Sequence, residues 1–181
     1  MIKKLFSWAK AVAIFGLLVW LASCSGTIAV TYSPGSVMKG TGPVKVATFN
    51  YVPYEQGEVK ANQVQNTAAG NFYTTKNIDK FITDAVIQEL SFVGYSVEDT
   101  ASKVINGRIS QFLADDLGFS VDWLINITFE ITGDEEMLYS NTFEARTKTS
   151  KGPGFVQGAV IEIVRDCIEE FIRDAQNRKV L

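Results

Sequence analysis

Hydrophobic and polar side chains alternate over residues 119–132, which is the clearest strand pattern in the chain. Alternation of this length predicts a β-strand with one buried face, and a polar opposite face is typical of an antiparallel sheet. Residues 133–135 predict a turn, and 137–148 then returns as a hairpin partner. Strands are also predicted over 44–50, 95–97 and 103–115, the last with Ile105, Ile109 and Leu113 on one side.

Two segments have the 3.6-residue period of amphipathic helices. Over 77–93 the apolar positions follow the i, i+3, i+4, i+7 rule, and Gly94 suits a left-handed helix end. A second helix is predicted over 155–175, after the chain-breaking Gly152-Pro153-Gly154. Two such helices and a sheet with one apolar face predict an α+β fold, a two-layer sandwich in which two amphipathic helices pack a mainly antiparallel sheet.

Two long segments have no sustained period. Residues 25–41 are rich in Gly, Ser and Thr, which favours a tether or an extended lead-in. Residues 51–75 form the second segment; aperiodic stretches of this length are often binding segments or locally disordered, and an edge strand over part of it is a further alternative. It contains Tyr51, Tyr54, Phe72 and Tyr73. Loop aromatics are frequent partner anchors, so we hypothesise that these four contact a protein or a lipid; the alternative is that they fold back and cap the sheet.

The first 23 residues are typical of an export signal. Three lysines precede an apolar run over 11–20, and small residues follow it, which predicts a secretory signal peptide. The run is shorter than the about 20 apolar residues that span a bilayer. It ends in Leu21-Ala22-Ser23-Cys24, which resembles the lipobox of bacterial lipoproteins. An ordinary signal peptide or an N-terminal membrane helix, with Cys24 incidental, is the alternative.

The lipobox resemblance implies a specific processing of Cys24. The peptide bond before it is cleaved, its sulfur carries a diacylglyceryl group, and its new amine takes a further acyl chain such as palmitate. Two or more chains anchor a protein stably in a membrane. Ser25 is not the Asp that usually retains lipoproteins at the inner membrane, so we expect an outer-membrane lipoprotein facing the periplasm. The expected parts are a signal peptide over 1–23, a lipidated N-terminus and tether over 24–43, and a single periplasmic domain over 44–181.

Charge excludes one class of partner. Removing the three lysines of residues 1–23 from the 17 basic side chains leaves 14 against 20 acidic ones, a net charge of −6. A nucleic-acid binder needs a basic footprint, and the sequence contains no Lys/Arg cluster, so we expect no nucleic-acid partner. An acidic body also gains nothing from anionic lipid surfaces by charge.

The inventory of reactive residues predicts no enzyme. The chain has no histidine, which excludes the Ser-His-Asp and Cys-His nucleophile systems and the common zinc sites. Cys167 lies on an apolar helix stripe, where burial makes a thiol inert. The acidic pairs are neighbours in sequence and point apart on a strand or helix: Asp115-Asp116, Glu135-Glu136 and Glu169-Glu170. We therefore expect no catalytic residue, no metal and no cofactor.

The mature chain resembles a family through the order of its elements. A lipobox, a strand, a helix ending near Gly94-Tyr95, the stretch 104–115 (VINGRISQFLAD), a long alternating strand, a hairpin return and a C-terminal helix follow one another. This order is similar to the YajG-type family of uncharacterised lipoproteins and, more loosely, to the auxiliary lipoproteins of envelope lipid-transport ABC systems. The resemblance implies the architecture, the periplasmic face and a non-catalytic role.

Two functions follow as expectations. The first is a non-catalytic envelope adaptor or accessory subunit, held at the membrane by its lipid anchor near an envelope protein whose identity the sequence does not give. The second is an auxiliary component of a lipid-transport system that offers a lipid ligand an apolar groove between helix and sheet. A groove lined by Phe81, Leu90, Trp123 and Ile163 would favour the second function, and a packed interior would favour the first.

Overall fold

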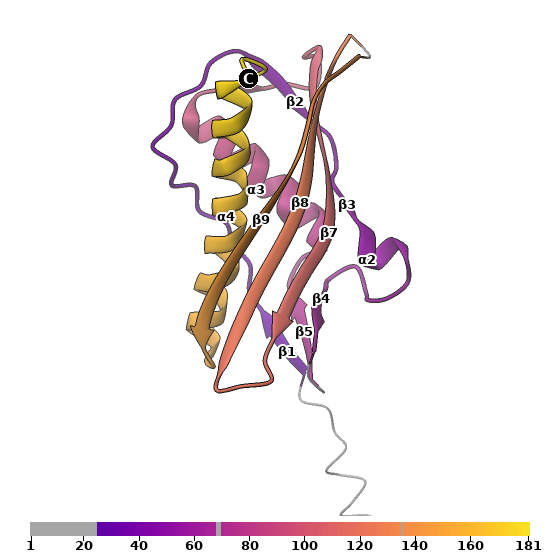
Figure 1. Ribbon diagram of the computed structural model, residues 1–181, viewed down its shortest axis with the longest axis vertical. Coiled ribbons are helices and arrows are strands. Elements are labelled where there is room, and N and C mark those ends of the chain that lie inside the picture. Colours follow the sequence, from indigo (N-terminus) through magenta and orange to yellow (C-terminus); the bar gives the residue numbers. More distant parts are fainter. Residues whose placement is uncertain (1–24, 68–69, 135) are drawn as a thin grey trace, which may run out of the picture.

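The structure is a computed structural model, and it describes residues 25–67, 70–134 and 136–181 (Figure 1). The described elements are, in chain order, β1 (Ser25–Ile28), β2 (Pro43–Val46), β3 (Asn50–Tyr51), α2 (Val52–Glu55), β4 (Gln63–Asn66), β5 (Asn71–Thr74), α3 (Ile78–Val93), β6 (Ser96–Val97), β7 (Lys103–Asp115), β8 (Ser120–Gly133), β9 (Glu136–Ser150) and α4 (Pro153–Asn177).

The long strands β7, β8 and β9 form an antiparallel ribbon along the whole molecule. Along β8, residues from Val121 to Ile131 alternate between buried and partly exposed, because one face packs against the helices. The β7 register shifts between Ile109 and Gln111. This irregularity corrects the expected face of β7, since it buries Phe112 and Ala114 in place of Leu113.

The other edge of β7 carries three short strands one after another. Strand β2 pairs with its beginning, β3 with its middle and β4 with its end, all in parallel. Strand β4 continues through antiparallel β5 to β1, which is parallel to β5. The α+β sandwich is therefore confirmed, with a mixed sheet whose long strands are antiparallel.

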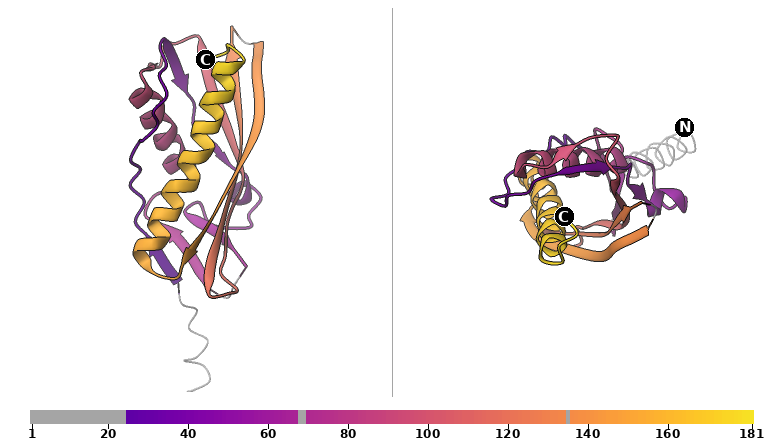
Figure 2. Two further views of the ribbon diagram at one scale, coloured as in Figure 1. Left: turned by 60° about the vertical axis from the view of Figure 1, so that its left-hand side comes forward. Right: turned by 90° about the horizontal axis from the view of Figure 1, so that it is seen from above.

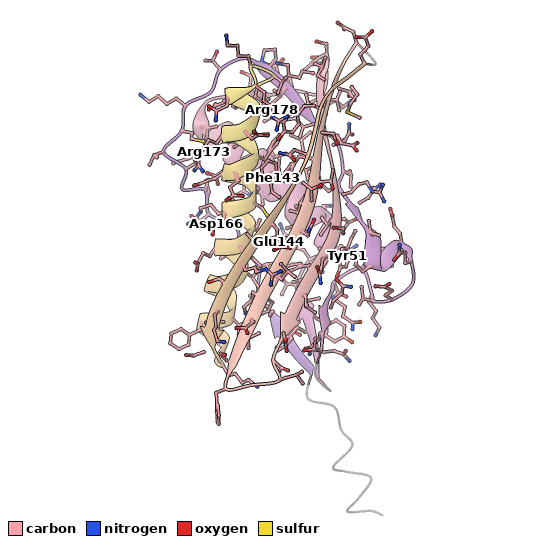
Figure 3. The ribbon with its side chains drawn as sticks, viewed as in Figure 1. Tyr51, Phe143, Glu144, Asp166, Arg173 and Arg178 are labelled. Atoms are coloured by element: carbon pink, nitrogen blue, oxygen red, sulfur yellow. The ribbon has the colours of Figure 1, made fainter. Side chains whose placement is uncertain are left out.

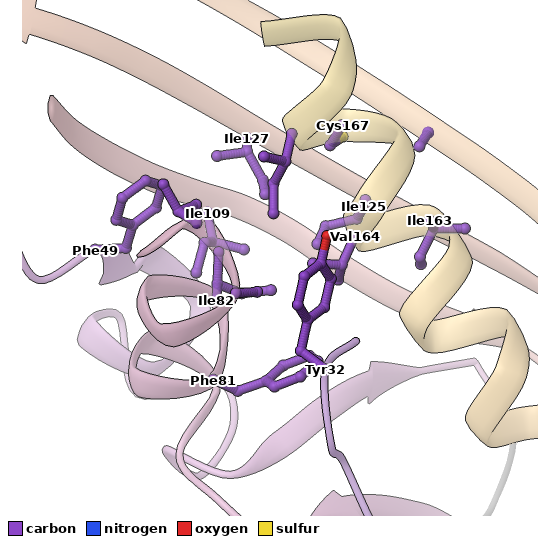
Figure 4. Close-up of a cluster of buried hydrophobic side chains, with 14 of the residues drawn as sticks. Tyr32, Phe49, Phe81, Ile82, Ile109, Ile125, Ile127, Ile163, Val164 and Cys167 are labelled. Carbon is purple, nitrogen blue, oxygen red and sulfur yellow. The ribbon is translucent and has the colours of Figure 1, made fainter. Parts of the chain in front are cut away.

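Helices α3 and α4 cover the same face of the sheet (Figure 2). Helix α4 packs on β8 and β9, while α3 lies beside α4 and contacts β2, β3 and β6. The rings of Phe129 and Phe171 stack between β8 and α4 with centroids 4.3 Å apart. Gly94 ends α3 with φ 111°, in the left-handed conformation that its sequence position predicted. The interior between the layers is filled by aliphatic and aromatic side chains (Figure 4).

Residues 25–43 are part of the folded domain, which corrects the expected tether. Residues 25–28 form β1, and Val30 and Tyr32 are buried in the core. Glu89, a fully buried carboxylate on α3, accepts hydrogen bonds from the Tyr32 hydroxyl and from the amides of Gly35 (3.2 Å) and Ser36 (2.7 Å). A buried carboxylate needs such donors, so Glu89 fixes this segment against α3.

The segment 51–75 is more regular than the sequence suggested, which allowed one edge strand within an aperiodic loop. It contains helix α2 and strands β4 and β5, each four residues long. Phe119 differs as well: the alternation placed it on the buried face, but β8 begins at Ser120 and Phe119 is fully exposed.

Candidate functional site

The described chain begins at one end of the elongated molecule, which we call the basal end. It is formed by β1, by the β7–β8 loop (residues 116–119) and by residues 151–155, which lead into α4 (Figure 1). Cys24, the expected lipid-attachment residue, lies outside the described residues. It is joined by one peptide bond to Ser25, the first residue of β1.

An apolar cavity of about 440 Å³ opens at the basal end. Its apolar side chains come from four elements, which bring together Ile28 of β1, Phe72 of β5, Val121 of β8 and Val156 of α4. The residues of the lining with polar side chains are Thr27, Asp116, Lys151 and Gln157. A concave, mostly apolar site with few polar groups is typical of sites for small apolar ligands.

The β7–β8 loop is held in place by hydrogen bonds at its base. The Asp115 carboxylate accepts hydrogen bonds from the Thr67 hydroxyl (2.7 Å) and from the amide of Leu117 (3.3 Å). These bonds hold the pKa of Asp115 below its usual range. On the other side, Lys151 Nζ donates to the carbonyl oxygen of Asp116 at 2.7 Å. The loop and the start of α4 are therefore connected directly.

The four aromatic residues proposed as partner contacts do not form one surface. Tyr51 is 2% exposed, and its hydroxyl donates to the carbonyl oxygen of Gln63 at 3.0 Å, so its ring belongs to the core (Figure 3). Phe72 packs against Trp123, with ring centroids 6.0 Å apart, and lines the basal cavity. Tyr54 is exposed on α2, and Tyr73 is half-buried beneath the Lys60 ammonium. Tyr51 is corrected to a structural role; contact through Tyr54, Phe72 and Tyr73 stays a prediction.

The groove expected between helix and sheet is filled. The four residues expected to line it belong to the continuous hydrophobic core, and each is at most 2% exposed: Phe81, Leu90, Trp123 and Ile163. Close packing leaves these side chains unavailable to a ligand. The apolar cavity of the basal end lies elsewhere, and Phe72 is the one candidate contact residue in its lining. Its lining combines short segments far apart in the chain, so no local pattern marks it.

A second, polar depression lies between β9 and α4. Glu144 and Arg146 contribute from β9, and Asp166 and Arg173 from α4 (Figure 3). The Arg146 guanidinium lies 2.8 Å from the Glu144 carboxylate and lowers its pKa, whereas partial burial, then Glu162, raises the pKa of Asp166. These side chains are exposed, and among the described residues no three potential metal ligands lie together. The depression has the character of a solvated surface of mixed charge.

Within the described ranges, no helix combines the length and apolar character needed to cross a membrane. Helix α4 is long enough, but one of its faces is lined with charged side chains.

Comparisons with known proteins define the fold. No family model and no curated protein matches the chain. Among solved structures, protein XCC0632 from Xanthomonas campestris, of the family DUF330, is similar with a TM-score of 0.67 and 11% identity, over 86% of this chain and 96% of that one. The hypothetical protein CT253 from Chlamydia trachomatis has a TM-score of 0.50 and 9% identity, over 73% of this chain and 96% of that one.

A protein from Caulobacter crescentus described as a candidate lipoprotein is more distant, with a TM-score of 0.41 and 4% identity over 53% of this chain and 78% of that one. The similarity to XCC0632 and CT253 shows a shared α+β fold, and at identities of 11% and 9% it shows nothing about activity. The resemblance to YajG-type lipoproteins therefore stays a prediction from the sequence.

Proposed function

We propose that this chain is a bacterial lipoprotein, anchored through acyl chains on Cys24, that serves as a non-catalytic adaptor or accessory subunit of the cell envelope. The observation that carries the proposal is the junction of the two parts: a lipobox-like sequence ends at Cys24, and the folded domain begins at Ser25. A lipid anchor there would restrict the domain to the membrane surface, which raises its effective concentration toward other envelope proteins.

Fatty-acid labelling tests the anchor. Cells that express the chain are fed a palmitate analogue, and the wild type is compared with Cys24→Ala and Cys167→Ala. We expect label in the wild type and in Cys167→Ala but none in Cys24→Ala, because Cys167 is buried. Equal labelling of wild type and Cys24→Ala would refute the lipidation.

Membrane fractionation tests the finer assignment to the outer membrane. The absence of Asp after Cys24 supports this membrane in bacteria that sort lipoproteins by that residue. We expect the wild type in the outer-membrane fraction and Ser25→Asp in the inner-membrane fraction. A wild-type protein recovered with the inner membrane would remove the outer-membrane assignment and leave the lipid anchor intact.

The adaptor role predicts a stable protein neighbour. Tyr54 is the exposed member of the four loop aromatics, so a photo-cross-linking residue is placed there. The matched control is the same residue at Glu98, which is also exposed but lies after β6. Mass spectrometry should identify an envelope protein captured from position 54 and not from position 98. Capture of no protein, or of the same proteins from both positions, would count against a partner contact at Tyr54.

The basal cavity favours a second candidate function, an accessory role in lipid transport. A mostly apolar cavity of about 440 Å³ suits an acyl chain. Gly154 lines this cavity, and a Cβ at Gly154 or at Gly158 meets no atom within 4 Å. We therefore expect Gly154→Leu to reduce the binding of a fatty-acid probe and Gly158→Leu to leave it unchanged. Equal binding by both variants would remove the cavity as a lipid site.

A further inference from the structure

Large apolar side chains are exposed at the basal end. Leu117 is 73% exposed, Phe119 is fully exposed and Phe155 is 65% exposed. Phe and Leu are among the side chains that membrane-surface segments bury at the boundary between headgroups and acyl chains. Exposing such groups to water is unfavourable, so their gathering at one end indicates a surface that another phase or molecule covers.

The sheet brings these three residues to one place. Ser120 at the start of β8 pairs with Ser150 at the end of β9, so the β7–β8 loop and the lead into α4 are neighbours. The hydrogen bond from Lys151 Nζ to the carbonyl oxygen of Asp116 joins the two segments. Leu117 and Phe119 on the loop and Phe155 on the first turn of α4 therefore share the basal end.

The N-terminal part of the chain joins the folded domain at this same end, and no flexible linker lies between Cys24 and the first strand. Strand β1 begins at Ser25, and its register with β5 pairs Ser25 with Asn71. One residue of extended chain spans at most about 3.6 Å. If Cys24 is acylated as proposed above, the basal end is held within about one residue of the lipid headgroups, because no flexible linker separates the anchor from the fold.

We propose that the basal end docks on the lipid bilayer, with Leu117, Phe119 and Phe155 inserted into the interface between headgroups and acyl chains. The inference rests on the proposed lipidation, which selects a lipid surface over a second copy of the chain or another protein. Insertion uses apolar contact, because the acidic body of the mature chain gains nothing from charge at an anionic membrane. The Lys151 ammonium lies next to the loop, at the level expected for headgroup phosphates.

Tryptophan fluorescence tests the docking in the full lipidated protein. Trp8 and Trp20 precede the expected cleavage site, so buried Trp123 is the only tryptophan of the mature chain and gives a constant background. Phe119→Trp and Phe155→Trp place a probe at the basal end. Phe92→Trp and Met137→Trp are matched controls, since these residues are 57% and 56% exposed but lie at the end of α3 and at the β8–β9 turn.

Each variant is reconstituted in phosphatidylcholine vesicles with and without bromine on the upper part of the acyl chains. Inserted side chains lie about 5–10 Å below the headgroup boundary, within reach of this quencher. We expect the 119 and 155 probes to lose roughly half of their emission and to shift to the blue, and the 92 and 137 probes to be unaffected. All substitutions are at exposed sites, so the urea unfolding midpoint should remain that of the wild type.

The outcomes separate this inference from the proposed anchor. Protein that floats with the vesicles but shows no bromine quenching at positions 119 and 155 overturns the docking and leaves the lipidation standing. A blue shift without bromine quenching indicates that a second copy or another protein covers the basal end, which also overturns it. Protein that does not float refutes the anchor itself and the docking with it.

Discussion

Gly107 lies in the middle of β7, directly beneath the ring of Phe49. A Cβ at this position would lie 1.9 Å from a ring carbon of Phe49, closer than any real contact. Phe49 cannot easily move, because it is 1% exposed, packs edge-on against Phe129 and donates its amide to the Thr83 hydroxyl. Only glycine fits here, for reasons of space.

We therefore predict that Gly107→Ala lowers the free energy of unfolding by about 1–3 kcal/mol, the usual cost of overpacking a core. Urea unfolding monitored by circular dichroism measures the change. The matched control is Gly118→Ala, where a Cβ meets no atom within 4 Å; it should shift stability by less than about 0.5 kcal/mol. Equal effects of the two substitutions would show that Phe49 does not confine position 107.

Cys167 provides a pH-dependent prediction. Its burial between α4, to which it belongs, and the sheet, and then the charge of Glu170, raise the pKa of the thiol from 9.0 to about 12. The folded state therefore holds this proton to higher pH than the unfolded state does. Its contribution to stability is complete below pH 9 and is lost progressively as the pH rises toward 12.

The expected result is a decline in the free energy of unfolding that begins near pH 9, before the tyrosines with raised pKa values contribute. In Cys167→Ala the decline between pH 9 and 10 should disappear, although alanine also lowers stability uniformly by leaving a small void. A thiol reagent at pH 8 should modify Cys167 in urea but not in the native protein. Rapid modification of the native protein would contradict its burial.

At the scale of elements, the contact between α3 and residues 32–36 depends on Glu89. Burial and the adjacent Glu89 carboxylate raise the pKa of Tyr32, so this tyrosine remains a hydrogen-bond donor at any ordinary pH. Arg165 on α4 adds a second attachment, because its guanidinium donates to the carbonyl oxygen of Ser33 at 2.6 Å. The N-terminal segment is thus held by both helices.

Glu89→Gln should lower the free energy of unfolding by about 1–3 kcal/mol. The carboxylate accepts three hydrogen bonds, and an amide, which has only one oxygen, cannot accept all of them. We expect faster hydrogen exchange at the Ser36 amide in this variant and no change in Glu98→Gln, an exposed control. A double-mutant cycle with Tyr32→Phe should give a coupling energy, since the two side chains share a hydrogen bond. Additive effects would mean that the bond contributes little.

Long elements could be predicted from the sequence, and short ones could not. Strand β8 and helix α3 bury one face over many residues, so their periods are visible without knowledge of their partners. Strands β2, β3 and β4 have two to four residues each and exist because β7 offers them an edge. Such pairing is non-local and leaves no periodic signal in the short strand itself.

Two features were not predicted from the sequence, each for a different reason. These are the attachment of residues 32–36 to α3 and the exposed apolar residues of the basal end. Glu89 follows Ala85 and Val86 by four and three residues, which places a carboxylate on the apolar face of α3. That misfit is a signal for a buried donor group, and it was present in the sequence. Phe119 gave a misleading signal, because its position fits the alternation of β8 although the strand begins only at the next residue, Ser120.

The whole molecule is a rod whose length is set by α4. Its 25 residues at about 1.5 Å per residue give about 37 Å, and the helix runs between the two ends of the sheet (Figures 1 and 2). The β8–β9 turn lies at the end opposite β1. Docking of the basal end on a bilayer therefore predicts that this turn stands about 37 Å from the headgroups.

Energy transfer to acceptors at the vesicle surface measures this height. A donor dye on Met137→Cys, in the Cys167→Ala background, should transfer weakly, and one on Leu117→Cys should transfer strongly. Inserting ten Gly/Ser residues between Cys24 and Ser25 adds a chain with a reach of about 18 Å. The difference between the two sites should persist with the insert, because the inserted side chains hold the basal end at the bilayer. A difference that disappears with the insert would mean that the short junction, rather than the docking surface, sets the orientation.

If Cys24 is acylated as proposed, the start of β1 at Ser25 also limits where the protein can act. Lipoproteins with long disordered leaders can explore the depth of the periplasm, whereas a domain joined directly to its acylated residue can only diffuse laterally and rotate about the membrane normal. Every encounter would then take place in a layer one molecule thick, so an interacting protein must itself be embedded in that leaflet or extend across the periplasm to reach it.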